Sequence, residues 1–251
     1  MNNNNSRPTP DPIARQLRQE AGFGCCKCGH PILQYHHIIP FSEEEHFRPE
    51  DMMVLCPNCH DEATQGAMTE GEQQKHKSQP YNRKRGYAKG MLKINDGQFV
   101  ISMGKNYFIG GGSIIQVDGS DIIRLDLNSE GSIELSAYLY DEQDNSLVSI
   151  IKNEWISGSI EAWDIEFKYR LLRIRKRTRS VDLTIDARKN PINIRANLWR
   201  KGHLISVDPN ILRVDRKGLD CGFVGCTFQS NCIDFRTHPD MHIAIKPNIL
   251  R

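Results

Sequence analysis

The sequence predicts an α+β protein in which a small cysteine-rich domain precedes a β-rich domain. Two observations carry this prediction. Five of the eight cysteines lie between Cys25 and Cys59, and strand-like segments separated by turn signals dominate the chain from Met91 onward. With 251 residues, of which 38% are apolar and 25% charged, the chain is long enough for two ordinary domains with hydrophobic cores.

The N-terminal stretch predicts a polar tail and a short helix over residues 1–20. The opening MNNNNSRPTPDP lacks the apolar region of a secretory signal. Residues 12–21 (PIARQLRQEA) are helix formers with a start after Asp11. No apolar run reaches the roughly 20 residues that a membrane-spanning helix needs. We therefore expect a cytoplasmic protein with no membrane partner.

Two Cys-x-x-Cys pairs predict a structural zinc site. Cys25 and Cys28 form the first pair, and Cys56 and Cys59 form the second. In a cytosolic chain such pairs indicate metal before disulfide, and four thiolates complete the tetrahedral set of a structural zinc. Cys26 falls outside this register and is expected to be a bystander. The zinc would clamp a motif too small to fold on its own core.

Two histidine-bearing runs lie within and after this cysteine framework. Residues 35–40 read YHHIIP, and residues 51–60 read DMMVLCPNCH. Together with the first cysteine pair, in this order and spacing, they resemble the HNH (His-Asn-His) endonuclease family, also called ββα-metal nucleases. The resemblance covers residues 21–62 and implies a small zinc-stabilised nuclease domain, which we place at residues 21–75.

The resemblance also assigns roles to single residues. It implies that His37 is the general base and that His36 and His60 hold one catalytic divalent ion. Asp51 stands where the family has asparagine. Since an ionised Asp only accepts hydrogen bonds whereas Asn also donates them, Asp51 is expected to brace the loop of the base with other partners or to help hold the ion.

These residue types suit phosphodiester hydrolysis. An imidazole can remove a proton from water near neutral pH, and a divalent ion polarises the phosphoryl oxygen. Two imidazoles plus water would accept Mg²⁺, Mn²⁺, Ni²⁺ or Zn²⁺, so the catalytic metal stays open. His30, His46 and His76 are expected to be ordinary surface residues.

A basic stretch follows the nuclease motif. The net charge of +2 favours no class of partner, so nucleic-acid binding has to rest on local patches. Between Lys75 and Lys93 there is no acidic residue, and two tyrosines are interleaved. The predicted phosphate contacts are Lys75, Lys77, Arg83, Lys84, Arg85 and Lys89. The alternative is a solvated linker, and we place a basic linker at residues 76–95.

Residues 96–251 predict a β-rich domain. Segments such as DIIRLDL, SIELSAYLY and INIRANLW alternate with turn signals and indicate a sandwich or a solenoid-like fold, with the sandwich ahead because no strict repeat is found. Three tryptophans and three cysteines are expected to be core residues of this domain: Trp155, Trp163, Trp199, Cys221, Cys226 and Cys232.

One segment of this domain is rich in arginine. In a strand, Arg173, Arg175, Arg177 and Arg179 would share one face. Such a row either meets acidic residues on neighbouring strands, which is the favoured interpretation, or binds an anionic partner.

The sequence therefore predicts a metal-dependent HNH endonuclease that hydrolyses DNA. By analogy of architecture it would be a bacterial defence or restriction effector whose β-rich domain recognises, regulates, or binds a second copy or another protein. The competing hypotheses are a non-catalytic zinc-dependent nucleic-acid-binding protein and an assembly protein that depends on the β-rich domain.

Overall fold

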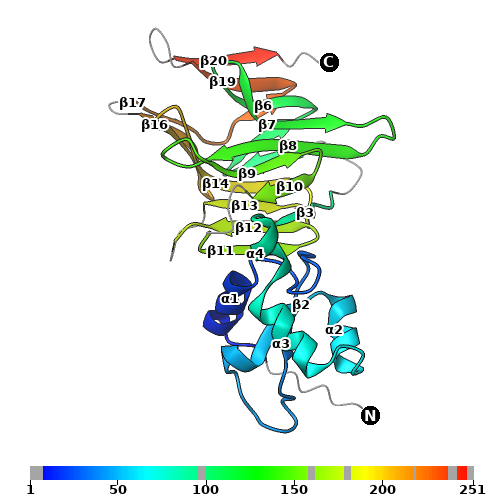
Figure 1. Cartoon of the computed structure of the whole chain (residues 1–251). Helices are drawn as coiled ribbons and strands as arrows, with labels where there is room; N and C mark the ends of the chain where they lie inside the picture. Colours follow the sequence, from blue (N-terminus) through cyan, green and yellow to red (C-terminus); the bar gives the residue numbers. More distant parts are fainter. Residues whose placement is uncertain are drawn as a thin grey trace. The chain divides into compact units, whose positions relative to one another are not determined.

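A computed structural model describes residues 8–94, 100–157, 162–177, 182–216, 219–236 and 242–247 (Figure 1). The chain separates into two compact units, Met1–Ala88 and Lys89–Arg251. The mixed α+β class expected from the sequence is confirmed, with the helices in the first unit and a large sheet in the second. No helix in the described part of the chain is both long and apolar enough to cross a membrane.

The first unit joins a short hairpin to several helices. Its elements are α1 Asp11–Glu20, β1 Gln34–His37, the 3₁₀ helix η1 Pro49–Asp51, β2 Met52–Leu55, α2 Pro57–Thr64, α3 Glu70–Ser78 and α4 Tyr81–Arg85. Proline stands in the first turn of α1, η1 and α2, where its missing N–H costs nothing. A capping box between Thr69 and Glu72 starts α3, and Gly86 in the left-handed region ends α4.

The core of the first unit forms around the hairpin. β1 and β2 are antiparallel, with His37 opposite Met52, and every residue of β2 is buried. Leu17 of α1 is 1% exposed and belongs to the same cluster. The predicted helix at residues 12–21 is therefore present, and it is an integral part of this core.

The residues expected to form a basic linker from position 76 instead fold back onto the first unit. The backbone N–H of Tyr81 donates to the carbonyl of Cys26 at 2.9 Å, and the Asn82 side-chain amide donates to the carbonyl of Gly22 at 2.9 Å. Asn82 is fully buried. The predicted linker is thus corrected for residues 76–88, because the backbone groups of the cysteine loop find their partners in α4.

The second unit consists of strands. They are β3 Lys89–Met91, β4 Val100–Met103, β5 Asn106–Ile109, β6 Gly112–Val117, β7 Ser120–Leu127, β8 Ile133–Tyr140, β9 Ser146–Ile151, β10 Glu154–Ser157, β11 Asp164–Lys168, β12 Leu171–Arg175, β13 Leu183–Asp186, β14 Ile192–Arg200, β15 His203–Val207, β16 Leu212–Arg216, β17 Leu219–Phe223, β18 Thr227–Gln229, β19 Asn231–Arg236 and β20 His242–Pro247. The unit begins at β3, so Lys89 belongs to it.

Strand pairing in the second unit follows two ladders. One runs β20-β19-β6-β7-β8-β9-β10-β3, and the other runs β11-β12-β13-β14-β15-β16-β17. Strands β4, β5 and β18 join the second ladder alongside β14. Alternate residues of β8 are buried, as in a sheet with one face toward a core.

Aromatic side chains connect the ladders across this core. Trp155 of β10 is fully buried, and its ring lies 5.3 Å from the ring of Phe167 of β11. The ladders are also paired directly, because Trp199 of β14 lies opposite Tyr140 of β8, so the strands of the second unit form one closed sheet. Trp163 and Trp199 are only partly buried. Cys232 is buried as expected, whereas Cys221 and Cys226 are partly exposed.

The arginine row of β12 meets acidic partners on the neighbouring strand. Arg173 pairs with Glu166 at 3.3 Å, and Arg175 pairs with Asp164 at 3.0 Å. Both carboxylates belong to β11, so the favoured interpretation of this row is confirmed for these two arginines. Arg179 lies outside the described residues.

Candidate active site and zinc centre

The four cysteines of the two Cys-x-x-Cys pairs converge at one point. The Sγ atoms of Cys25, Cys28, Cys56 and Cys59 all lie within 4.8 Å of one another, and these residues are the one such group of three or more metal-ligating residues in the described chain. Cys25 and Cys28 come from the loop before β1, and Cys56 and Cys59 flank the start of α2.

The sulfur spacing tests whether zinc fits this cluster. A zinc–thiolate bond of ~2.3 Å in tetrahedral geometry places the sulfurs ~3.8 Å apart. The Sγ of Cys28 lies 3.7 Å from that of Cys56 and 3.8 Å from that of Cys59. The donor set and its spacing therefore fit a structural zinc, as the sequence predicts.

When no cation is bound, burial and the close approach of these sulfurs disfavour the charged thiolate form. Burial, followed by the charge of Cys25, raises the pKa of Cys28 to about 12. Burial and the neighbouring cysteines also raise the pKa of Cys59. Zinc would offset this cost by taking the charge of all four thiolates. Cys26 is also buried and its pKa is raised to about 12 by desolvation, but its sulfur is outside the cluster.

A second constellation consists of His36 from β1 and His60 from α2. Their rings lie 5.0 Å apart and are perpendicular, at 88°. Both side chains are partly exposed. Ions such as zinc lie ~2.1 Å from a ligating imidazole nitrogen, so two rings at this separation are within reach of one ion.

Hydrogen bonds determine which ring nitrogen of His36 is available. Its Nε2 lies 3.0 Å from Oε1 of Gln73, whose amide nitrogen already donates to the carbonyl of Met68. Oε1 therefore accepts, Nε2 carries the proton, and Nδ1 of His36 keeps its lone pair. Gln73 is a buried residue of α3 that the sequence analysis did not identify. The capping box that starts α3 indicates the helix, but it does not indicate that Gln73 contacts a histidine.

His60 is oriented in a similar way by its own helix. The Thr64 hydroxyl donates to the His60 carbonyl at 2.8 Å, so it can only accept from Nδ1 of the same residue, at 3.4 Å. This leaves the lone pair on Nε2. His36 and His60 thus each present one free nitrogen, which is the form that binds a metal ion.

His37 follows His36 at the end of β1 and has a separate set of contacts. Its Nε2 lies 3.1 Å from the carbonyl of His46, which can only accept, so the lone pair is on Nδ1. The ring also packs edge-on against His46 and Phe41. Within the described residues, the His37 ring makes no hydrogen bond or ring contact with His60 or Asp51.

His46 is buried, at 6% exposure, which corrects its assignment as a surface residue. Both its ring nitrogens are used within its own loop, by the carbonyl of Ile39 and the N–H of Arg48. The loop therefore holds its backbone carbonyl against His37. His30 is exposed as expected, and His76 is half-buried.

The comparison with known families addresses the same segment. Residues 25–66 match the HNH endonuclease family model. This confirms the resemblance seen in the sequence, and residues 25–66 are called the HNH segment from here on. No curated protein and no solved structure matches the chain. The four clustered cysteines and the three histidines lie inside the HNH segment, whereas Gln73 lies beyond it.

Burial favours the neutral form of the His36, His37 and His60 imidazoles by lowering their pKa values. Desolvation, followed by the charge of His60, lowers the pKa of His36 to about 4, with His37 as a weaker influence. Desolvation also lowers the pKa of His37 and of His60. At neutral pH each ring therefore keeps a lone pair for a metal ion or a proton.

Asp51 follows the loop of His46 and makes no hydrogen bond to His37 within the described residues. Its carboxylate accepts from Nε of Arg48 at 2.7 Å, and its carbonyl accepts from the N–H of Ile38 at 2.8 Å. Arg48 in turn pairs with Glu44. Asp51 is thus attached to the loop that carries His46, as a bracing residue would be.

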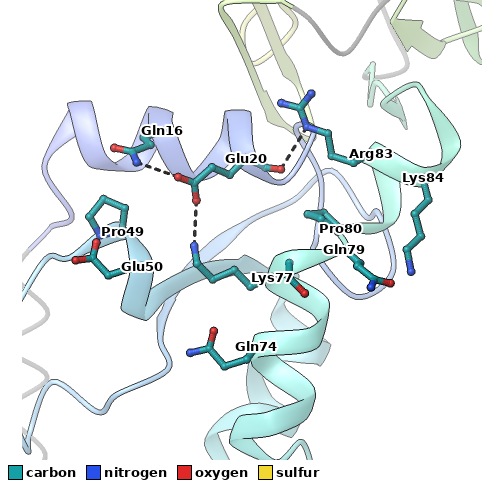
Figure 2. A pocket seen from close by; sticks show the side chains of 11 residues that line it. Gln16, Glu20, Pro49, Glu50, Gln74, Lys77, Gln79, Pro80, Arg83 and Lys84 are labelled. Carbon is teal, nitrogen blue, oxygen red and sulfur yellow. Dashed lines mark hydrogen bonds and ion pairs between the residues drawn. The ribbon is translucent and has the colours of Figure 1, made fainter.

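Two of the predicted nucleic-acid contacts are used inside the first unit. Lys77 pairs with Glu20 at 3.0 Å, and the Arg83 guanidinium donates to the carbonyls of Gln19 and Glu20 at the end of α1 (Figure 2). These residues line a hollow of about 740 Å³ that includes none of the three histidines. The cations compensate the carbonyl end of α1.

The other basic positions differ in their availability. Lys75 and Lys84 are exposed and make no ion pair within the described residues. Arg85 lies over the ring of Tyr87, 4.4 Å from its centroid, and donates to its carbonyl. Lys89 pairs with Glu154 of the second unit at 2.8 Å. Lys75 and Lys84 are therefore the residues of this stretch best placed to meet a phosphate.

Proposed function

We propose that the first unit is a metal-dependent nuclease that hydrolyses DNA phosphodiester bonds. One observation supports the proposal: the rings of His36 and His60 lie 5.0 Å apart, each with one ring nitrogen left unprotonated, and the neighbouring His37 has its proton held on Nε2 by a backbone carbonyl.

His37 acts as the general base. The His46 carbonyl keeps the proton on Nε2, so Nδ1 can accept the proton of an attacking water. The hydrogen bond to the carbonyl also stabilises the imidazolium that results. The lowered pKa of His37 keeps this base neutral under physiological conditions.

His36 and His60 would hold the divalent ion through Nδ1 and Nε2, with substrate oxygens and water as further ligands. When bound, such an ion polarises the phosphoryl oxygen and stabilises the leaving oxygen. Mg²⁺, Mn²⁺, Ni²⁺ and Zn²⁺ are all candidates. Asp51 braces the loop of the base through Arg48, and the four thiolates clamp the start of α2 on which His60 stands.

Lys75 and Lys84 follow the HNH segment and would hold the DNA backbone as exposed cations. The second unit would select the substrate, regulate cutting, or pair with a second copy or another protein. By analogy with nucleases joined to sensing domains, we place this protein in bacterial defence or restriction, in the cytoplasm, where its thiols stay reduced.

Plasmid nicking tests the proposal. Supercoiled plasmid and single-stranded DNA are incubated with wild type, His37→Ala and His60→Ala, each with Mg²⁺, Mn²⁺, Ni²⁺ or Zn²⁺. We expect cutting by wild type alone with at least one metal. Equal cutting by all three proteins would indicate a contaminant. Zinc-dependent DNA binding without cutting by wild type would support a non-catalytic binding protein instead.

A further inference from the structure

A polar hollow lies on the second ladder of the second unit, outside the HNH segment. Its volume is about 690 Å³, within the range of ~300–1,000 Å³ typical of small-molecule sites. Strands β12, β13 and β14 and the turn after β15 form it. Its lining residues are Arg173, Arg175, Thr184, Asp186, Asn193, Arg195, Asn197, Val207, Asp208 and Pro209.

Strand register places two arginines on either side of a hydroxyl. Arg173 of β12 is opposite Thr184 of β13, and Thr184 is opposite Arg195 of β14. Directly opposite residues on neighbouring strands have Cβ atoms ~5 Å apart, so the three side chains form one row across the sheet. The row brings two cations to the hollow without an anion between them.

The carboxylates of the hollow already have other partners. Asp186 accepts from two guanidinium nitrogens of Arg188, at 2.9 and 2.6 Å. Asp208 accepts from the backbone N–H groups of Asn210 and Ile211, at 2.7 and 3.1 Å. Arg173 is held from the opposite side by Glu166 of β11. Neither carboxylate lining the hollow therefore pairs with Arg195.

Two groups in the hollow have no partner within the described part of the chain. The Arg195 guanidinium makes no hydrogen bond or ion pair there. The Thr184 hydroxyl is equally unpartnered, although the residue is 91% buried, at 9% exposure. The Thr184 hydroxyl is still reached by solvent from the hollow, so a ligand oxygen could take the place of water there.

We propose that this hollow binds a small ligand that carries a phosphate group. Arg195 would bind the phosphate through its planar fork of donors, with Arg173 as the second cation and the Thr184 hydroxyl as a donor at the floor. Asn193 lines the same hollow; its amide nitrogen donates to the Ser102 hydroxyl at 3.0 Å, and its amide oxygen can accept from a polar group on the rest of the ligand. The site is independent of the nuclease proposal, because none of its residues lies in the first unit.

Isothermal titration calorimetry tests this site in the full-length protein. Every protein carries His37→Ala, so that any cutting does not complicate the titrations. The probes are inorganic phosphate, AMP, adenosine as the phosphate-free control, and a single-stranded oligodeoxynucleotide without terminal phosphates. The variants are Arg195→Ala, Arg195→Gln and Thr184→Val, with Lys105→Ala as a matched loss of an exposed cation elsewhere in the second unit.

We expect AMP and phosphate to bind and adenosine not to bind. Arg195→Ala and Arg195→Gln should weaken AMP binding about tenfold or more, and Thr184→Val should weaken it about five- to tenfold, whereas Lys105→Ala should leave it unchanged. If Arg195→Ala does not fold, the AMP affinities of Arg195→Gln and Thr184→Val test the proposal. Equal AMP affinity in the folded Arg195 and Thr184 variants, or no binding of phosphate or AMP, overturns the proposal. Arg195-dependent binding of the oligonucleotide alone also overturns it, since the face would then bind nucleic acid strands.

Discussion

Nε2 of His36 and Oε1 of Gln73 lie 3.0 Å apart and join a strand of the HNH segment to a helix beyond it. The Gln73 amide is itself anchored on the carbonyl of Met68. The proposed metal ligand is therefore oriented by a residue that is not part of the family match. Loss of such an orienting partner typically reduces metal affinity or activity 10- to 100-fold.

Gln73→Leu should lower the affinity of the first unit for the divalent ion without unfolding that unit. The substitution keeps the side chain at a similar size but frees the proton on His36, so the ring loses its preferred orientation. We expect the metal concentration for half-maximal plasmid cutting to rise about 10-fold or more. The exposed neighbour Gln74→Leu is the matched control. An unchanged metal dependence in Gln73→Leu would remove the orienting role.

Removal of zinc should unfold the first unit alone. The sulfur spacing fits one zinc, and a motif with so small a core depends on that ion for folding. Cys28→Ser should therefore lower the zinc content measured by atomic emission and abolish the helical signal in circular dichroism, while the β signal remains. Cys26→Ala should retain its zinc. Full zinc content in Cys28→Ser would contradict the assignment.

Asn82→Ala should destabilise the first unit by about 2 kcal/mol. The substitution leaves the buried carbonyl of Gly22 without its donor and opens a small cavity under α4. The room is made by Gly24, because an added Cβ there would collide with the Asn82 side-chain amide. Urea unfolding followed by circular dichroism measures the change, and the exposed Lys84→Ala serves as the control. Equal midpoints in both variants would place α4 outside the folded core.

Asp141 should make the second unit sensitive to acid. Burial acts to raise the pKa of this carboxyl, but Lys176 and the amides of Gln143 and Asn145 outweigh it and lower the pKa from 3.8 to about 2. A lowered pKa stabilises the folded state above pH ~4, and this stability is lost as the pH falls through ~2.

The matching substitution is Asp141→Asn. It should lower the free energy of unfolding of the second unit by about 2 kcal/mol at pH 7 and flatten its decline between pH 4 and pH 2. The exposed Glu142→Gln is the control, and urea unfolding at several pH values gives the curves. If the free energy of unfolding of Asp141→Asn falls between pH 4 and pH 2 as steeply as that of wild type, other groups cause the acid sensitivity.

The clustering of the four cysteines could be predicted from their spacing, and the roles of the histidines stay predictions that rest on the same spacing. Two Cys-x-x-Cys pairs define a tetrahedral site wherever the intervening chain folds. His36, His37 and His60 occupy fixed positions relative to those pairs, and the first and last of them do meet in space. Alternating burial in β8 likewise follows from its sequence, since a half-buried strand has period two.

Residues that act through backbone groups escaped prediction. His46 has no distinguishing spacing, and its contribution is a carbonyl, which every residue has. Lys77 and Arg83 belong to a stretch whose composition fits a linker, and only the end of α1 explains where their charges go. Arg195 is unremarkable in the sequence because its isolation depends on strand register across β12, β13 and β14.

The most direct measurement of the nuclease account is chemical rescue of His37→Ala. Single-turnover cleavage of DNA is followed in His37→Ala and His36→Ala with and without imidazole in the buffer. We expect His37→Ala to be about 10²- to 10⁴-fold slower than wild type and to regain part of its rate with imidazole, because a free base replaces the missing one. His36→Ala, which lacks a metal ligand, should stay slow. Cleavage by His37→Ala at the wild-type rate would contradict the assignment of His37 as the base.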